Sequence, residues 1–229
     1  MITFEHVSKS FDSLEIFHDL SLHVDANQIV AVVGPSGSGK TPLLKLVTGI
    51  VQPDEGTIAV AEGPVGYVFQ EPRLLPWRTA LDNVAAGLRA QGSNKEDARG
   101  RAAAWLERVG LSGFEHYHPA ELSGGMAQRV SIARAFAVDP RILLLDEPFS
   151  NIDQTLKGSL MEILQSIIRE RQTTAMYVTH DLTEALRLAD RFVEISPERR
   201  LRELDLSDRL AVAREWLAES LGDLAAGAH

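Results

Sequence analysis

The sequence predicts an α/β fold in which a parallel sheet is interrupted by a helical insert. Short apolar runs typical of strands buried on both faces occur at 29–33, 142–145, 174–178 and 192–195. Between the first run and the others, residues 79–138 change to mostly helical composition. A glycine-rich loop joins the first run to a helical stretch, and this alternation of strands and helices is typical of a parallel sheet covered by helices.

The elements before the insert follow from apolar patterning and turn residues. The segments at 2–11 and 20–24 alternate or run apolar like strands, and the polar residues 25–28 form a turn before the strand at 29–33. Beyond the glycine-rich loop we expect, in order, a helix at 43–50, a turn at 53–56 and a strand at 65–69.

The insert carries its own start and stop signals. Thr79 and Asp82 are spaced as in a capping box, and Gly92 ends the helix that they begin. A second helix is expected at 94–109, closing at Gly110. The insert is therefore predicted to hold more than one helix.

The last third returns to strands and helices. A helix is expected at 154–170, between the apolar runs described above. After residue 200, four leucines fall at helical spacing and Ser207 is available as a cap. This tail is expected to be a helix packed on its own domain, or alternatively a regulatory or dimer contact, with frayed residues at 225–228. The four leucines are Leu206, Leu210, Leu217 and Leu221.

Composition excludes several classes of protein. The chain has 229 residues, 45% of them hydrophobic, as in ordinary globular proteins. A net charge of −9 argues against broad nucleic-acid binding, which needs a basic surface. The absence of cysteine excludes disulfides and thiolate metal sites. Since no apolar run approaches membrane-span length and residues 1–5 lack secretory features, we expect a cytosolic protein that contacts a membrane only through a partner.

The residues between the strand at 29–33 and the next helix match the phosphate-loop pattern GxxxxGK[ST]. In such a loop, backbone N–H groups and a helix N-terminus surround phosphate oxygens, and glycines allow the close approach. Lys40 is expected to reach the β- and γ-phosphates, and the Thr41 hydroxyl to bind Mg²⁺. The alternative, an ordinary glycine-rich turn, does not account for the lysine and threonine. The nucleotide-binding residues are Gly34, Pro35, Ser36, Gly37, Ser38, Gly39, Lys40, Thr41 and Pro42.

Two adjacent acids end the apolar run at 142–145. In open α/β sheets ligands bind beyond the carboxyl ends of the strands, so Asp146 is placed to hold Mg²⁺, directly or through water. Glu147 can then accept a proton from the water that attacks the γ-phosphate. The alternative is a solvated acidic turn, which explains any isolated Asp-Glu pair.

A serine followed by two glycines opens the helical stretch that begins near 124. Ser123 can cap this helix, and Gly124 and Gly125 leave N–H donors free for an anion. Taken alone, a capped core helix explains this feature equally well. Together with the phosphate loop and the paired acids, however, the sequence 122–126 resembles the signature loop of the ATP-binding cassette (ABC) family, which grips the γ-phosphate of ATP held by the opposite subunit.

This resemblance covers about residues 2–200 and implies a RecA-like parallel core, an N-terminal antiparallel β arm and a helical subdomain. It implies a single ABC ATPase domain over 1–229. Its parts are the core and arm at about 1–70 and 139–200, the insert at about 71–138 and a C-terminal helical tail at about 201–229.

Four further residues match family landmarks in order. Phe11 matches the aromatic residue that stacks on adenine, although it could equally be a core residue. Gln70 matches the glutamine that senses Mg²⁺ and the attacking water. Asp153 matches the aspartate that communicates between two sites, with a helix cap as the alternative, and His180 matches the histidine that contacts the γ-phosphate.

The resemblance also implies the partners and the cycle. Two cassettes, either identical or paralogous, would face head to tail around two Mg-ATP, closing when ATP binds and separating after hydrolysis. A separate membrane permease, served by a solute-binding protein, would complete a transporter, with the cassette peripheral on the cytoplasmic face of the inner membrane and no nucleic acid involved. The segment 73–77, with Leu74, Leu75 and Trp77, borders the permease groove in this family or is ordinary core.

Two positions depart from the family pattern. Met126 replaces the usual glutamine of the signature, so a polar contact is lost. Pro42 replaces a serine or threonine whose N–H and hydroxyl face the α-phosphate, and it disfavours helical dihedrals at Thr41. We therefore expect weakened but not abolished nucleotide binding.

The sequence of residues 73–84 is most similar to that of cassettes from importers of the nitrate, sulfonate and taurine type. Two alternatives stay open: a soluble ABC ATPase of a non-transport system such as cofactor assembly, and a nucleotide-gated subunit with weak hydrolysis.

Overall fold

Two sheets form the framework of the computed structural model, which describes residues 1–12, 14–150, 152–196 and 199–204. The larger sheet has six strands in the order β5-β6-β7-β3-β8-β9, and the smaller has three in the order β2-β1-β4. The strands are β1 (Ile2–Phe11), β2 (Leu14–Val24), β3 (Ile29–Val33), β4 (Glu55–Val60), β5 (Val65–Val68), β6 (Ile142–Asp146), β7 (Thr174–Thr179), β8 (Arg191–Ile195) and β9 (Leu201–Leu204).

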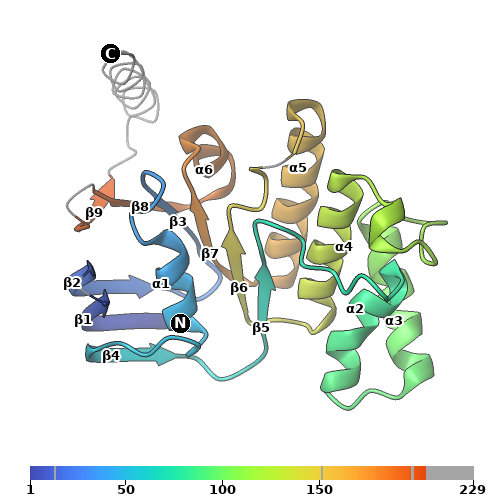
Figure 1. The fold of residues 1–229 in the computed structure, drawn as a ribbon, viewed down its shortest axis with the longest axis horizontal. Coiled ribbons are helices and arrows are strands. Elements are labelled where there is room, and N and C mark those ends of the chain that lie inside the picture. Colours follow the sequence, from blue (N-terminus) through green and yellow to red (C-terminus); the bar gives the residue numbers. More distant parts are fainter. Residues whose placement is uncertain (13, 151, 197–198, 205–229) are drawn as a thin grey trace.

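Helices cover both faces of the six-stranded sheet (Figure 1). They are α1 (Lys40–Val47), α2 (Ala80–Ala90), α3 (Lys95–Arg108), α4 (Gly124–Ala137), α5 (Gln154–Arg171) and α6 (Leu182–Leu188), with a short 3₁₀ turn at Pro119–Glu121. Strands β5, β6, β7, β3 and β8 are parallel, and β9 runs antiparallel to β8 at the edge. The predicted parallel core with a helical insert is therefore confirmed.

The side chains of the central strands alternate between two cores, because successive residues of a strand point to opposite faces. Val30 and Val32 of β3 pack with α1 and the three-stranded sheet. Ile29, Ala31 and Val33 pack instead on the side of α4, α5 and α6. Strand β3 is completely buried, which explains its uninterrupted apolar sequence.

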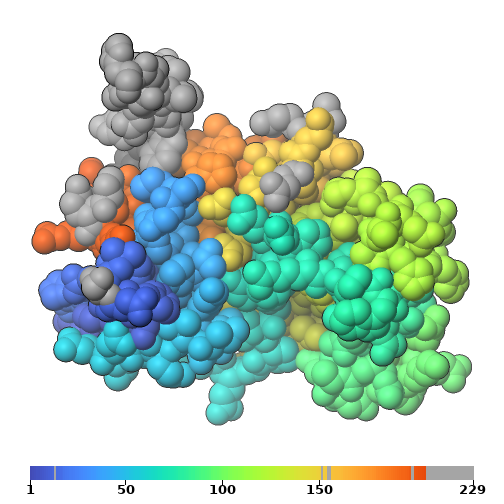
Figure 2. Space-filling view, in the orientation of Figure 1, coloured from blue at the N-terminus to red at the C-terminus, as the bar shows by residue number. Residues whose placement is uncertain are grey.

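The two ends of the molecule are built differently. The antiparallel sheet β2-β1-β4 lies on one side of the core, which confirms the β arm, and α2, α3 and α4 form the insert on the other side (Figures 1 and 2). Thr79 caps α2 by accepting a hydrogen bond from the Asp82 amide at 3.2 Å, and Asn94 caps α3 in the same way at 2.9 Å. Gly92 and Gly110 follow these helices with positive φ, as their predicted role as helix ends requires.

Three expectations need correction. The segment at 201–204 is strand β9, so the helical tail predicted from 201 is wrong at its start; the rest of that tail, including its leucines, lies outside the described residues. Thr41 lies within α1, so it is helical although Pro42 was expected to disfavour helical dihedrals there. The turn predicted at 53–56 is shorter, because β4 already begins at Glu55.

Sequence patterning also missed α6, β4 and the first half of β2. Helix α6 has seven residues, about two turns, which is too short to show a clear period in sequence. In the first half of β2 the two buried apolar residues, Ile16 and Phe17, are adjacent in sequence, so the alternation typical of a strand is broken there.

Candidate nucleotide site

Three neighbouring parallel strands end at the same edge of the large sheet, and each is followed by a candidate residue. The phosphate loop follows β3, Glu147 follows β6 and His180 follows β7, and these strands lie in the order β6-β7-β3. The carboxyl edge of a parallel sheet is where α/β proteins bind ligands. Segments more than 100 residues apart in sequence therefore meet at one place because of the strand order.

The phosphate loop turns into α1 through Gly39. This residue has φ 106°, in the left-handed region, and an added Cβ would lie 2.7 Å from Ile16 Cγ2 and 3.1 Å from the Phe17 ring. Only glycine fits both constraints. The first intrahelical bond of this turn, from Leu43 N to Gly39 O, is 3.0 Å long. The N–H groups of Lys40 and Thr41 precede it, so they have no intrahelical acceptor and can serve an anion.

The ammonium group of Lys40 is held inside the site. Its Nζ donates to the carbonyl oxygens of Gly34 and Pro35, each at 2.8 Å, and lies 3.5 Å from Glu147 Oε1. The side chain is 5% exposed. Burial lowers the pKa of Lys40, while Glu147 and Asp146 act in the opposite direction. In the same loop the Ser38 hydroxyl is buried and has no hydrogen-bond partner among the residues that the structure describes, so the loop contains a polar group available to a ligand as well as a buried cation.

Asp146 connects the phosphate loop to strand β5. Its Oδ1 accepts from the Thr41 hydroxyl at 2.8 Å and its Oδ2 from the Tyr67 hydroxyl at 3.1 Å. Burial, together with the Asp146 charge, raises the pKa of Tyr67 far above its usual range. Tyr67 therefore stays protonated and donates. The structure thus brings together Thr41 and Asp146, two of the three residues that were predicted for Mg²⁺; the third is Gln70.

Glu147 lies between Lys40 and His180. Its Oε2 is 2.8 Å from His180 Nδ1, and its backbone N–H donates to Val178 O at 3.0 Å. Glu147 has φ 43°, a conformation uncommon for a side chain with Cβ and frequent at functional sites. The carboxylate thus contacts both an ammonium and an imidazole, and His180 itself is 52% exposed.

The other predicted residues lie around this centre. Phe11 is 40% exposed at the end of β1, with Lys9 Nζ 5.5 Å from its ring centroid, so it is not a core residue. Gln70 is exposed, directly after Phe69, where β5 leads into the insert. Asp153 immediately precedes α5, and its carbonyl oxygen accepts from Lys157 N at 2.9 Å.

The Ser123 loop is placed apart from the phosphate loop of the same chain. Ser123 caps α4 by accepting from Met126 N at 3.2 Å, and a Cβ on Gly124 would meet open space. In Figure 1, α4 and α1 lie on opposite sides of β6 and β7. Ser123 therefore caps an exposed helix N-terminus with free N–H donors, and α4 lies across β6 and β7 from the helix that follows the phosphate loop.

Sequence reasoning missed Tyr67 and Gln128. The buried amide of Gln128 donates to Phe69 O at 3.3 Å and to Pro148 O at 2.8 Å, so α4 is tied to both Gln70 and the Glu147 turn. Arg134, also on α4, donates to Pro72 O and Arg73 O. These contacts depend on the strand order and on the packing of α4, and the only signal in the sequence is a polar residue inside an apolar helix face.

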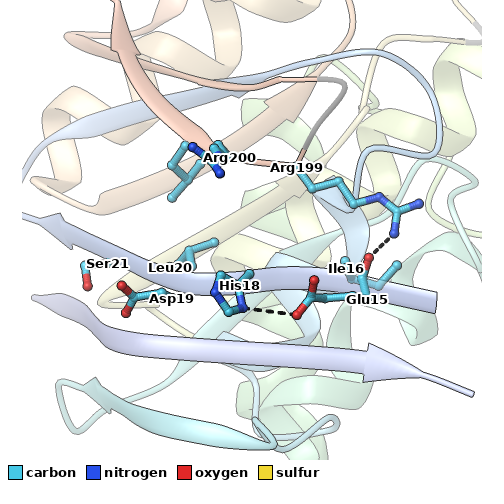
Figure 3. A pocket seen from close by; sticks show the side chains of 9 residues that line it. Glu15, Ile16, His18, Asp19, Leu20, Ser21, Arg199 and Arg200 are labelled. Carbon is cyan, nitrogen blue, oxygen red and sulfur yellow. Dashed lines mark hydrogen bonds and ion pairs between the residues drawn. The ribbon is translucent and has the colours of Figure 1, made fainter. Parts of the chain in front are cut away.

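A cavity of about 600 Å³ adjoins the site beside β2 (Figure 3). It is lined by Glu15, Ile16, His18, Asp19, Leu20 and Ser21 of β2 and by Arg199, Arg200 and Leu201. The Arg199 guanidinium closes one end by donating to the Glu15 carbonyl oxygen. Since Ile16 also contacts Gly39, this cavity and the phosphate loop share a wall.

The family model described as "ABC transporter" matches residues 17–150. The chain belongs to the ABC transporter family. It is 47% identical over 186 residues to the taurine import ATP-binding protein TauB of Yersinia pestis, covering 78% of this chain and 73% of that protein. It is 42% identical to the Fe(3+) ions import ATP-binding protein FbpC of Rhizobium etli, covering 84% of this chain and 57% of that protein. The chain thus spans little more than half of the iron import relative.

A solved structure is similar over nearly its whole length. The dimeric, post-hydrolysis ABC cassette MJ0796, bound to ADP and Pi, superposes with a TM-score of 0.81 and 29% identity, covering 90% of this chain and 99% of that one. The ABC fold predicted from the sequence is confirmed, and this ABC cassette is an ATPase that binds ATP.

Proposed function

We propose that this ABC cassette is the ATP-hydrolysing subunit of an importer. The observation that carries the proposal is the meeting of Lys40, Asp146, Glu147 and His180 at one sheet edge, next to a helix N-terminus. The import ATP-binding proteins for taurine and iron support the direction of transport. The solved dimer supports assembly with a second cassette, either identical or paralogous.

The residues present fit a Mg-ATP substrate. Lys40 is a buried ammonium whose present acceptors are two loop carbonyls, and Ser38 has a buried hydroxyl available. Thr41 and Asp146 are hard oxygen donors already in contact, and Gln70 is exposed nearby for the same cation. Mg²⁺, when bound, would neutralise charge on the β- and γ-phosphates.

Each protein group has a separate task in the hydrolysis. Phe11 would stack on the base, and the N–H groups of the loop with Lys40 would hold the phosphates. Glu147 would accept a proton from the attacking water while the water oxygen bonds to the γ-phosphorus and ADP leaves. His180, hydrogen-bonded to Glu147, would contact the γ-phosphate.

The second half of each site would come from the partner's signature. Ser123 and Gly124 are exposed at the start of α4, and α4 lies on the other side of β6 and β7 from α1. Asp153 would lie at the junction of the two sites. ATP would then act as a bridge that closes the dimer.

A membrane permease is the partner for transport, with a solute-binding protein delivering the solute to it. None of the helices in the described part of the chain is long and apolar enough to cross a membrane. Trp77 is 70% exposed, on a turn that the buried Asn83 amide fixes through the carbonyls of Leu75, Arg78 and Thr79. A large exposed aromatic side chain on a hydrogen-bonded turn supports docking of the permease beside the insert, with the cassette peripheral on the cytoplasmic face of the inner membrane.

For the solute we propose a small anion of the taurine, sulfonate or nitrate type. Of the two import relatives named above, the taurine protein has the higher identity. Transport by the reconstituted permease complex tests this directly, with radiolabelled taurine against ferric iron. Uptake of iron without taurine would contradict the solute assignment and leave the ATPase assignment standing.

The ATPase activity is tested on the purified chain. We expect phosphate release from ATP that requires Mg²⁺ and is lost in Lys40→Ala. A nucleotide-gated subunit with weak hydrolysis is the second candidate, because Pro42 removes a donor from the loop. ATP-dependent dimer closure without phosphate release would favour that candidate.

A further inference from the structure

A partly buried charged cluster lies next to His180 in the sequence and the fold, among groups that the hydrolysis described above does not use. It joins the first turn of α5 to the end of β7 and the start of α6, which lies beside α5 (Figure 1). The cluster, called the Lys157 cluster here, consists of Lys157, Tyr177, Thr179, Asp181 and Glu184.

Lys157 is the only basic residue in this cluster and spans the two helices. Its backbone N–H donates to Asp153 O at 2.9 Å, so it lies one helical turn after Asp153. Its Nζ is 3.0 Å from Asp181 Oδ2 and forms a second ion pair with Glu184. The side chain is 14% exposed. One ammonium therefore connects the Asp153 loop to both acids that follow His180.

The acids in turn fix the backbone around His180. Asp181 caps α6 by accepting from Thr183 N at 2.9 Å, and its own N–H donates to the Thr179 hydroxyl at 3.0 Å. Glu184 accepts from the Thr179 hydroxyl at 3.0 Å and from the Tyr177 hydroxyl. His180 lies between these anchored residues, so its backbone position depends on the cluster.

The charges show what Lys157 does for the two acids. Asp181 and Glu184 both lie at the start of α6, and repulsion between two carboxylates so close is offset by the shared ammonium. Burial by itself would lower the pKa of Lys157, but the two carboxylates outweigh it and raise the pKa. Lys157 therefore stays charged at neutral pH. Among the residues that the structure describes, neither Asp181 nor the buried Glu184 has another ion-pair partner, so without Lys157 their charges would not be paired.

We propose that Lys157 is a positioning residue that holds the Asp153 loop and the His180 loop in one fixed relation. A shift of Asp153 when a partner cassette docks is then transmitted to the contact between His180 and Glu147. This inference rests on the proposed function and extends it to a residue that touches neither nucleotide nor metal. The route runs from Asp153 along the first turn of α5 to Lys157, then through Asp181 to His180, and finally to Glu147 Oε2 at 2.8 Å.

The test compares three variants with the wild type in the full chain. Lys157→Met removes the charge and keeps the length, and Lys157→Arg restores a cation. Arg169→Met is the matched control, since it breaks the 2.9 Å ion pair to Asp190 near the far end of the same helix, away from His180. Steady-state ATPase kinetics give kcat and KM, and nitrogen-15 histidine NMR of the nucleotide-free protein reports the His180 ring, identified with His180→Gln.

We expect Lys157→Met to lower kcat by about 10- to 100-fold, with KM for ATP changed less than twofold, because the groups that hold ATP are untouched. The His180 resonance should shift, Lys157→Arg should recover at least half of the lost kcat on a logarithmic scale, and Arg169→Met should match the wild type in both readouts. If Lys157→Met does not fold, Lys157→Gln takes its place.

Each result decides a separate point. A Lys157→Met protein with wild-type kcat and an unmoved His180 resonance overturns the inference, and so does an equal effect of Arg169→Met. A wild type that binds but never hydrolyses ATP removes the proposed ATPase function instead. In that case the His180 resonance alone decides whether Lys157 positions the loop.

Discussion

Replacement of Pro42 is expected to change the affinity for nucleotide much more than the stability of the fold. The residue is the third of α1, after Lys40 and Thr41, and the first intrahelical bond of the turn comes from Leu43. A donor at this position has no intrahelical acceptor, so proline removes no helix bond. It does remove the N–H that would face a phosphate, together with the hydroxyl of the usual serine or threonine. Pro42→Thr should therefore restore two donors to the anion site.

The expected gain follows from the cost of a missing hydrogen bond to a charged group. Such a bond contributes about 1.5–3 kcal/mol, and each 1.4 kcal/mol is tenfold in affinity. Pro42→Ala, which restores the N–H alone, should then bind nucleotide about 10- to 150-fold more tightly. Pro42→Thr restores the hydroxyl as well and should bind at least as tightly as Pro42→Ala. Loss of the proline should lower the free energy of unfolding by about 1 kcal/mol or less, through the greater freedom of the unfolded chain.

Calorimetric titration with ADP and Mg²⁺ measures this without interference from hydrolysis, because the missing donors face the α-phosphate that ADP retains. Urea unfolding of the same proteins measures stability. Dissociation constants for Pro42→Thr and Pro42→Ala within twofold of the wild type would refute the reasoning, since the N–H at this position would then contact no phosphate.

Two further predictions concern the acids of the site. Tyr67→Phe removes the hydroxyl that donates to Asp146 Oδ2 at 3.1 Å. The Mg²⁺ concentration for half-maximal ATPase activity should therefore change at least threefold, while the ATPase rate at saturating Mg²⁺ should change little. An unchanged Mg²⁺ titration would show that Tyr67 does not influence the metal. Burial opposes ionisation of Asp181, but Thr183 and Lys157 outweigh it and lower the pKa of Asp181 below 3.8. Its stabilising contribution should therefore be complete above about pH 5 and be lost as the pH falls through the lowered pKa. Asp181→Asn should consequently cost most stability near pH 7 and least near pH 3 in urea unfolding, and a pH-independent difference would contradict the assignment.

Lys40, Asp146 and Glu147 could be predicted because each follows directly from a local pattern, whereas His180 was assigned only through the resemblance to the ABC family. The apolar strand before Gly34, the spacing to Lys40, and the acids ending the run at 142–145 all lie within single short segments. Their meeting in space also followed, since parallel strands end at one edge of the sheet.

What the sequence could not predict depends on long-range packing. Tyr67 reaches Asp146 only because β5 pairs with β6, and no local pattern gives that strand order. Lys157 looks like any lysine on a helix until α6 packs beside α5. Strand β9 has four residues, two of them exposed charges at an edge, so its sequence shows no clear alternation.

Glu147 is the proposed base of an ATP site that a second cassette completes, and the other roles proposed for the site depend on it. The most direct test is Glu147→Gln with ATP and Mg²⁺, followed by phosphate release and by size-exclusion chromatography. We predict that this variant binds ATP, releases phosphate at least 100-fold more slowly than the wild type, and elutes as a dimer only with ATP. Hydrolysis at the wild-type rate would contradict the account.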